Sequence, residues 1–236
     1  VYKGRTLMEP RFTPLSEPTG GKEASLPEIL SGTLPPAFYE QQTLEVARQM
    51  LGKTLLVVPE DAETADEATA GIIVETEGYL GPDDPASHAF GGRTRRNDIM
   101  WGAPGFAYVY FTYGNHWMVN VVTGPEGLAA AVLVRAVQPI LGLETMRERR
   151  GLHRLKGKKG DQQLTNGPGK LCQALGITGA FNGQALAGPR LYLAETPPAH
   201  RLPHFQTIET TRIGITRGVE FPWRFYVKNN AFVSRV

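Results

Sequence analysis

Two segments joined by Gly114-Asn115 limit most strongly how this chain can fold. Residues 107–113 and 116–123 are rich in aromatic and β-branched side chains, which favour β-strands. Gly and Asn tolerate the positive φ angles that a two-residue turn requires. The sequence therefore predicts a tight β-hairpin with Tyr113 at its tip.

Further apolar segments predict that this hairpin belongs to a larger sheet. Strands are predicted at residues 53–59, 72–79, 128–137, 191–193, 212–216 and 223–227, and helices at 43–50, 141–149 and 169–175. This pattern favours an α+β fold with a large, mostly antiparallel sheet. Residues 1–35, rich in Pro, Gly, Ser and Thr, are predicted to form an extended or mobile tail before a single domain of residues 36–236.

Composition excludes several classes of protein. Hydrophobic residues make up 41% of the chain, which is enough for a core, but no run resembles a membrane span. The first ten residues contain charges and no apolar segment, so we expect an intracellular protein with no membrane partner. Cys172 is the only cysteine and is expected to be buried in a helix. No His/Cys cluster has metal-ligand spacing, so we expect neither a metal nor another cofactor.

The strand at residues 72–79 carries two acids. In an extended strand Glu75, Glu77 and Tyr79 share a face, which places the two carboxylates roughly 7 Å apart. A carboxylate beside an aromatic ring can deprotonate a water for attack at a sugar C1′, and it can also stabilise the positive charge that develops there. The pattern alone does not choose between Glu75 and Glu77 as the catalytic acid. Either could also be an ordinary exposed glutamate on a strand, with no catalytic role.

Aromatic residues accompany these acids. Four of the eight tyrosines lie between Tyr79 and Tyr113, and each combines a ring that can stack on a planar ligand with a hydroxyl that can form a hydrogen bond. Such a set suits a pocket for a nucleobase. The alternative is structural, with Tyr108 and Tyr110 in the core and His88 in an ordinary loop.

Charge is distributed unevenly. The net charge of +2 gives no reason to expect nucleic-acid binding, but residues 147–170 hold eight basic side chains against two acidic ones. A second basic segment, Arg93-Thr-Arg-Arg96, follows Gly91-Gly92. We expect both segments to be flexible and able to neutralise phosphates, although a run of charges is often only a solvated loop.

Several of these short motifs together resemble the alkyladenine DNA glycosylase family, also called the 3-methyladenine or methylpurine DNA glycosylase family. The similarity runs in colinear order from about Pro36 to the region of Tyr192. It is carried by Val74-Glu-Thr-Glu-Gly-Tyr-Leu-Gly-Pro82, His88, Gly91-Gly-Arg93, Asn97, Tyr108-Val-Tyr110, Tyr113-Gly114, Asn120, Arg135 and Gly167-Pro-Gly-Lys-Leu-Cys-Gln-Ala-Leu175.

The resemblance implies roles for the catalytic residues. Glu77 falls on the acid that activates the attacking water, which leaves Glu75 as a supporting acid. Arg135 falls on an arginine near that water and the phosphate of the target nucleotide. The resemblance also implies that the sheet is curved, that helices flank it and that the hairpin protrudes.

The resemblance implies further roles in holding DNA. Tyr79 and His88 would hold the flipped base, Tyr110 would stack opposite, and Asn120 would discourage guanine by crowding its amino group. Tyr113 would insert into the minor groove and fill the gap left by the extruded nucleotide. Contacts with the DNA backbone are assigned to Arg93, Arg95, Arg96 and Lys170.

These expectations combine into one function with two alternatives. We expect a monomeric, cofactor-free, monofunctional glycosylase that acts where the cell keeps its DNA and removes alkylated or deaminated purines from double-stranded DNA, leaving an abasic site. A hydrolase of free nucleosides or small glycosides would use the acid pair but would not need the basic segments. A non-catalytic nucleic-acid binder would use the tyrosines but would not need Glu77.

Overall fold

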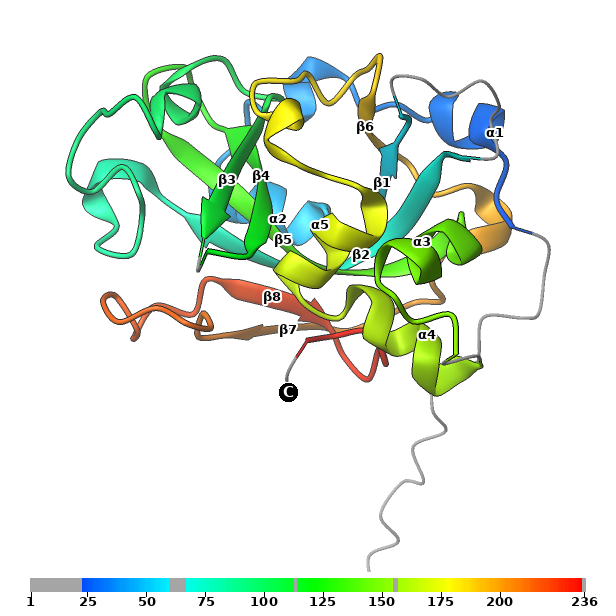
Figure 1. The fold of residues 1–236 in the computed structure, drawn as a ribbon. Helices are drawn as coiled ribbons and strands as arrows, with labels where there is room; N and C mark the ends of the chain where they lie inside the picture. The colour runs from blue at the N-terminus through cyan, green and yellow to red at the C-terminus, as the bar shows by residue number, and fades with distance from the viewer. Residues whose placement is uncertain (1–22, 60–66, 113, 155–156, 235–236) are drawn as a thin grey trace, which may run out of the picture.

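The chain forms one antiparallel sheet with helices packed against it (Figure 1). The computed structural model describes residues 23–59, 67–112, 114–154 and 157–234. Within these ranges the strand order is β3-β4-β5-β2-β1-β6, with β8 paired to both β2 and β7. The strands are β1 (Thr54–Val57), β2 (Thr69–Tyr79), β3 (Ala107–Thr112), β4 (His116–Thr123), β5 (Ala130–Leu141), β6 (Leu191–Ala194), β7 (Thr207–Thr210) and β8 (Arg224–Val227).

Strand β2 is the centre of the sheet. One of its edges pairs with β5, while the other pairs first with β1 and then with β8. Because β1 and β8 share this edge, the sheet divides into two diverging parts and curls into a half-barrel (Figure 1). The predicted α+β class and the large, curved, antiparallel sheet are confirmed, and β3 and β4 form the predicted hairpin.

The helices that the structure describes are short. They are α1 (Leu26–Leu30), α2 (Thr43–Gln49), α3 (Leu143–Arg149), α4 (Lys158–Thr165) and α5 (Pro168–Leu175). Short 3₁₀ turns occur at Pro36–Phe38, Gly81–Asp83, Asp98–Trp101, Gly179–Phe181 and Pro198–His200. Helices α2, α3 and α5 agree with the predicted ones. None of the described helices is long and apolar enough to cross a bilayer.

Helix α4 corrects the prediction of a flexible basic loop. Its sequence is polar and contains a glycine, so it gives no strong helical signal. Tertiary contacts hold it instead: Leu164 is fully buried, and the hydroxyl of Thr165 donates to the carbonyl of Val137 at 2.6 Å. Arg147 of α3 is also anchored to Asp161 of α4, with Nη2 and Oδ1 2.5 Å apart.

The main core lies between one face of the sheet and helices α2 and α5. It includes Val46 of α2, Met50 directly after α2, Leu171 and Leu175 of α5, and Val134 of β5. Cys172 is buried in α5, as predicted, and burial raises the pKa of its thiol. This packing leaves the opposite face of β2 to β5 available for a site.

A smaller cluster includes residues that precede Pro36. Ala24 and Ile29 are buried together with Leu56 and Ile72. The domain boundary at residue 36 stays a prediction, although this packing begins earlier in the chain.

One predicted strand is wrong. Residues 212–216 form a loop, because Gly214 and Gly218 adopt positive φ angles and Arg212 turns into the interior instead of alternating along a sheet. Strand β7 was not predicted, because its four residues are half-exposed and carry no apolar run.

Strands β2 and β5 contain matching irregularities that set which residues face the site. Ile73 and Val74 are consecutive, yet both belong to the main core cluster, and so do Ala136 and Val137. The pairing shifts between Ile73 and Glu75 and shifts back before Thr76. Such a bulge changes which alternate residues share a face.

Candidate active site

A row of paired residues crosses five strands on the face opposite the main core. Tyr108 of β3 pairs with Asn120 of β4, Asn120 with Leu133 of β5, Leu133 with Glu77 of β2, and Glu77 with Arg224 of β8. Residues paired in this way point to the same side of a sheet. Residues far apart in the chain are therefore brought onto one surface by strand register alone.

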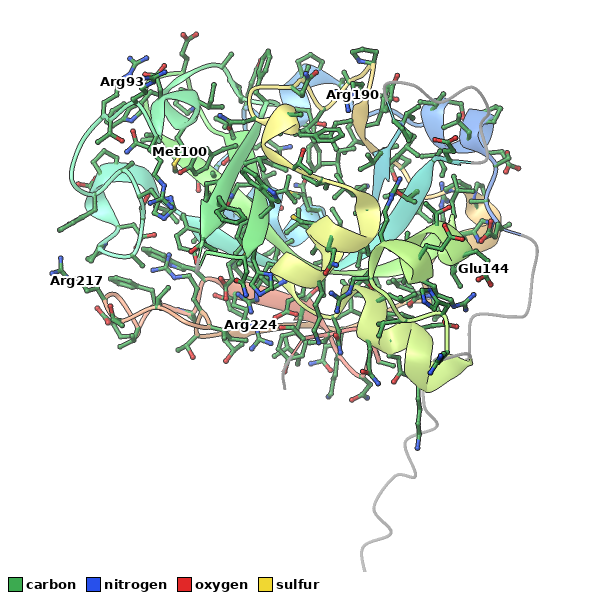
Figure 2. All side chains as sticks on the ribbon, viewed as in Figure 1. Arg93, Met100, Glu144, Arg190, Arg217 and Arg224 are labelled. Carbon is green, nitrogen blue, oxygen red and sulfur yellow. The ribbon has the colours of Figure 1, made fainter. Side chains whose placement is uncertain are left out.

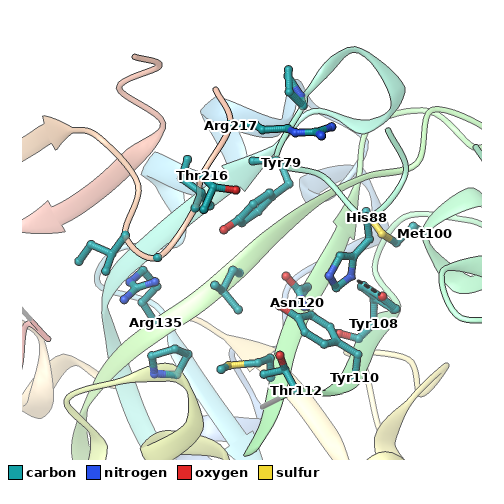
Figure 3. Close-up of a pocket in the computed structure, with 18 residues that line it drawn as sticks. Tyr79, His88, Met100, Tyr108, Tyr110, Thr112, Asn120, Arg135, Thr216 and Arg217 are labelled. Carbon is teal, nitrogen blue, oxygen red and sulfur yellow. Dashed lines mark hydrogen bonds between the residues drawn. The ribbon is translucent and has the colours of Figure 1, made fainter. Parts of the chain in front are cut away.

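A cavity of about 430 Å³ lies over this row (Figure 3). Its walls come from β2 to β5, from the loop around residues 85–88, from Pro168 at the start of α5 and from the loop 213–217. The loop 213–217 was not expected at the site, because the sequence predicted a strand there. A cavity of this size holds a small planar ligand.

Glu77 lies fully buried beneath this cavity. Its Oε1 accepts the backbone N–H of Ile213 at 2.7 Å, and its Oε2 accepts the hydroxyl of Tyr79 at 3.0 Å. The same Oε2 is 3.2 Å from Nη1 of Arg135. Burial raises the pKa of Glu77, and Arg135 and the two hydrogen bonds offset only part of that effect. Glu77 is thus a carboxylate that accepts a proton more readily than an exposed one does.

Glu75 has a different environment. Its Oε1 accepts Nε of Arg135 at 3.1 Å, Nε of Arg224 at 2.7 Å and the hydroxyl of Ser234 at 2.9 Å. Its Oε2 accepts the backbone N–H of Ser234 at 2.7 Å. Two arginines and Ser234 contact this carboxylate, so its geometry suits holding Arg135 in place.

Arg135 bridges the two acids, and its side chain is 8% exposed. Burial alone would lower the pKa of Arg135, but the carboxylates of Glu77 and Glu75 more than compensate and raise it. The guanidinium therefore stays charged and lines the cavity. No group of His, Cys, Asp and Glu in the described parts of the chain could hold a metal ion.

Three aromatic residues form two sides of the cavity. Figure 3 shows Tyr79 across the cavity from His88 and Tyr110, whose ring centroids are 4.4 Å apart. Burial raises the pKa of Tyr79 well above its usual value, and the charge of Glu77 adds to this effect, so the hydroxyl keeps its proton. The structure thus brings the three predicted base-pocket aromatics to one cavity.

Tyr108 and Asn120 orient their neighbours. Nδ1 of His88 is 2.8 Å from the hydroxyl of Tyr108, and Nδ2 of Asn120 donates to the Tyr108 carbonyl at 3.0 Å. Burial lowers the pKa of His88, and Arg96 lowers it further, so the imidazole is neutral near pH 7. Burial also raises the pKa of Tyr108 to about 12. Tyr108 is a core residue, as one interpretation of the sequence had it, but its hydroxyl also fixes His88.

The predicted backbone contacts lie in different settings. The guanidinium of Arg96 is 5.5 Å from the ring centre of Tyr110, which places it at the cavity. Arg95 is exposed, and Arg93 pairs with Asp98 at 2.6 Å. Nζ of Lys170 donates to Asn166 at 2.8 Å, two residues from the Pro168 that lines the cavity. Tyr113 lies outside the described residues.

Arg217 is a cationic residue of the cavity that the sequence did not indicate. It lies in the loop 213–217, and the sequence predicted a strand at residues 212–216 with no part in the site. Figure 2 shows Arg93, Met100 and Arg217 toward the same side of the molecule in this view, and Met100 and Arg217 both line the cavity. Arg217 and Arg135 thus both bring positive charge to the lining of the cavity.

Part of the basic segment at residues 147–170 is not available for phosphates. Arg147 is buried between Glu144 and Asp161. Arg149 donates to the carbonyl of Ala174 at 3.3 Å, and Arg150 donates to the side chain of Gln173. The expectation that this whole segment is flexible and solvated is wrong for these three arginines. Lys156 lies outside the described residues, whereas Lys159 is exposed.

Comparison with known proteins identifies relatives along most of the chain. Residues 37–231 match the family model "Methylpurine-DNA glycosylase (MPG)". Three similar proteins carry the name "Putative 3-methyladenine DNA glycosylase". The one from Methanoculleus marisnigri is 48% identical over 204 residues, or 86% of this chain and 99% of its own length. Those from Granulibacter bethesdensis (46% over 212 residues, 89% and 90%) and Bacillus cytotoxicus (43% over 206 residues, 85% and 98%) are similarly close.

Proposed function

The chain belongs to the methylpurine-DNA glycosylase family, and from this premise we propose that it removes damaged purines from duplex DNA through a water activated by Glu77. It is a hydrolase of N-glycosyl bonds, as 3-methyladenine DNA glycosylases are. The observation that carries the choice of Glu77 is the contrast between its carboxylate and that of Glu75, which two arginines and Ser234 already occupy.

In the proposed mechanism Glu77 acts as the general base. Water enters the cavity between Tyr79 and Arg135, which both line it and both contact Oε2 of Glu77. Glu77 takes a proton from this water as the oxygen attacks C1′ and the bond to the base breaks. The carboxylate also stabilises the positive charge that develops on the sugar, while Arg135 orients Glu77 and faces the target phosphate.

The base must leave the helix to reach this cavity. We propose that the nucleotide is flipped and that its base lies between Tyr79 on one side and Tyr110 with His88 on the other. Alkylated purines are cationic, so the tyrosine faces add an attraction of about 0.5–2 kcal/mol. Hypoxanthine and ethenoadenine are neutral bases, so their recognition would instead depend on a hydrogen bond from neutral His88. Asn120, fixed by the Tyr108 carbonyl, would crowd the amino group of guanine.

Two observations favour this function over the alternatives. The cationic groups around the opening, including Arg96 and Arg217, suit phosphates, which a hydrolase of free nucleosides does not need. A binder without catalysis does not need a buried carboxylate, which costs free energy to desolvate.

The test is base release from defined duplexes. The protein is incubated with duplexes that carry one 3-methyladenine, 7-methylguanine or hypoxanthine, and with free inosine, and abasic sites or free base are measured. We expect release from at least one lesion duplex and none from inosine. Release from inosine alone would favour the nucleoside hydrolase, and binding without release would favour the non-catalytic binder.

A further inference from the structure

A column of stacked groups supports the buried side of Tyr79. The guanidinium carbon of Arg212 lies 4.7 Å from the ring centre of Tyr79 and 4.9 Å from that of Trp223. Phe221 stacks on Trp223 with ring centres 4.3 Å apart and an angle of 6°. Arg212 is buried and does not line the cavity, whereas Tyr79 does, so the arginine covers the ring from behind.

Asp84 fixes the plane of this guanidinium. Its two oxygens accept Nη1 and Nη2 of Arg212 at 2.5 and 2.8 Å, and both side chains are 0% exposed. Asp84 is itself held by the backbone N–H groups of Leu80 and Ala86, and Arg212 Nη1 also donates to the carbonyl of Gly78 at 3.0 Å. A planar arginine fork held in this way has little freedom to move.

Stability alone does not explain this pair. Desolvation of two charges offsets most of their attraction, so a buried ion pair is often no more stable than apolar residues of similar volume. The contacts of this pair nevertheless converge on the residues beside Glu77 and Tyr79. Its evident effect is on position, because it joins the end of β2 to the loops around residues 84 and 213–218.

We propose that Arg212 and Asp84 are positioning residues that hold the ring of Tyr79 ready to stack on an extruded base. Arg212 keeps the ring of Tyr79 from tilting when the base binds. The side chain therefore loses less conformational entropy on binding. Asp84 neutralises the guanidinium, so that no unpaired positive charge lies behind a ring that meets cationic bases on its other face. This inference rests on the proposed function, because it assumes that a base stacks on Tyr79.

The experiment compares Arg212→Met and the double variant Asp84→Asn/Arg212→Met with wild type. Single-turnover base release is measured on one lesion duplex from which the wild type releases base, together with affinity for that duplex relative to an undamaged one. We expect release to slow by about tenfold to a hundredfold and the affinity ratio to fall, with undamaged binding unchanged. If Arg212→Met fails to fold because Asp84 is left unpaired, the double variant, which has no unpaired charge, carries the test.

Arg48→Met is the matched control. Arg48 also stacks on an aromatic ring, 4.5 Å from the centre of Phe225, and pairs with an acid, Glu209, at 3.0 Å, but it does not line the cavity. We expect this variant to release base at the wild-type rate. If the wild type is active and the Arg212 variants release base as fast as Arg48→Met does, this inference is wrong but the proposed function stands. A wild type that releases base from none of the three lesion duplexes would refute the proposed function, and the inference with it.

A double-mutant cycle tests whether Arg212 acts through Tyr79. In a Tyr79→Leu background we expect the Asp84→Asn/Arg212→Met change to cause no further loss of the affinity ratio, since the ring it supports is gone. If the losses of the affinity ratio are fully additive, the pair does not act through Tyr79 but through another group, such as the neighbouring Ile213 amide. That result would overturn the proposal.

Discussion

Nη1 of Arg135 lies 3.2 Å from Oε2 of Glu77, and both side chains are almost completely buried. The charge of Arg135 and the burial of the pair have opposite effects on the protonation of Glu77. The positive charge favours the ionised carboxylate that a general base must be, while burial favours the neutral acid. The protonation state of Glu77 therefore depends on two opposing effects, so substitutions and pH should change it in a known direction.

Glu77→Gln tests the assignment of the general base. The amide keeps the shape of the side chain but cannot take a proton from water, so base release should fall by about 10²- to 10⁴-fold. Binding to lesion-bearing DNA should persist, which gel-shift titration measures alongside single-turnover release. Glu75→Gln is the matched variant, and we expect it to retain more activity than Glu77→Gln. The reverse order would show that Glu75 is the base.

The pH dependence of kcat/KM follows from the raised pKa of Glu77. The base must be deprotonated, so the rate should fall as pH decreases through a pKa above the usual 4.5 of a glutamate. Arg135→Gln removes a charge that lowers this pKa, so the acid limb should move to higher pH. His88→Gln is the control and should leave the limb in place. An acid limb below pH 4.5, or a shift to lower pH in Arg135→Gln, would contradict this account.

Tyr113→Ala tests the wedge at the hairpin tip, whose turn joins β3 to β4. Removing the ring should weaken binding to a damaged duplex, because nothing then fills the space of the extruded nucleotide. Binding to a single-stranded substrate should change little, since no stack has to be opened. Parallel titrations of both substrates measure the difference, and equal losses would assign Tyr113 a structural role.

The lysines near the start of α4 are expected to supply non-specific affinity. Changing Lys156, Lys158 and Lys159 to Gln should weaken binding to damaged and undamaged duplex alike. It should also flatten the log–log salt dependence by at most about one unit for each phosphate that is no longer neutralised. The control is Arg201→Gln, an exposed site in another part of the chain. Unchanged affinity at every salt concentration would exclude the electrostatic role, and a loss confined to the lesion duplex would indicate that these lysines recognise damage.

The sequence predicted those parts of the fold that depend on local pattern. Alternation and turn chemistry indicated the hairpin and most strands, and helical periodicity indicated α2, α3 and α5. Helix α4 was missed because tertiary contacts hold it, namely the burial of Leu164, the hydrogen bond from Thr165 to Val137 and the ion pair between Asp161 and Arg147 of α3. The loop at residues 212–216 was mistaken for a strand, because its isoleucines alternate although Arg212 is bound elsewhere.

The site was predictable only where its residues lie close in sequence or match a family motif. Glu77 and Tyr79 share a strand face, and the structure joins them by a hydrogen bond. In contrast, Arg212 and Asp84 are separated by 128 residues, and Glu75 and Ser234 by 159. Nothing in local pattern indicates such pairs, because they depend on how β8 and the C-terminal segment meet β2.

The paired irregularities in β2 and β5 restrict how these strands can change in length. The extra core-facing residue at Ile73 and Val74 is balanced by the one at Ala136 and Val137, so the register beyond Thr76 is the same as before Ile73. Deleting one residue from either strand alone would exchange its inward and outward faces from that point and turn Glu77 toward the core. We therefore expect that, among descendants of this chain, gaps and insertions at these positions persist only as compensated pairs.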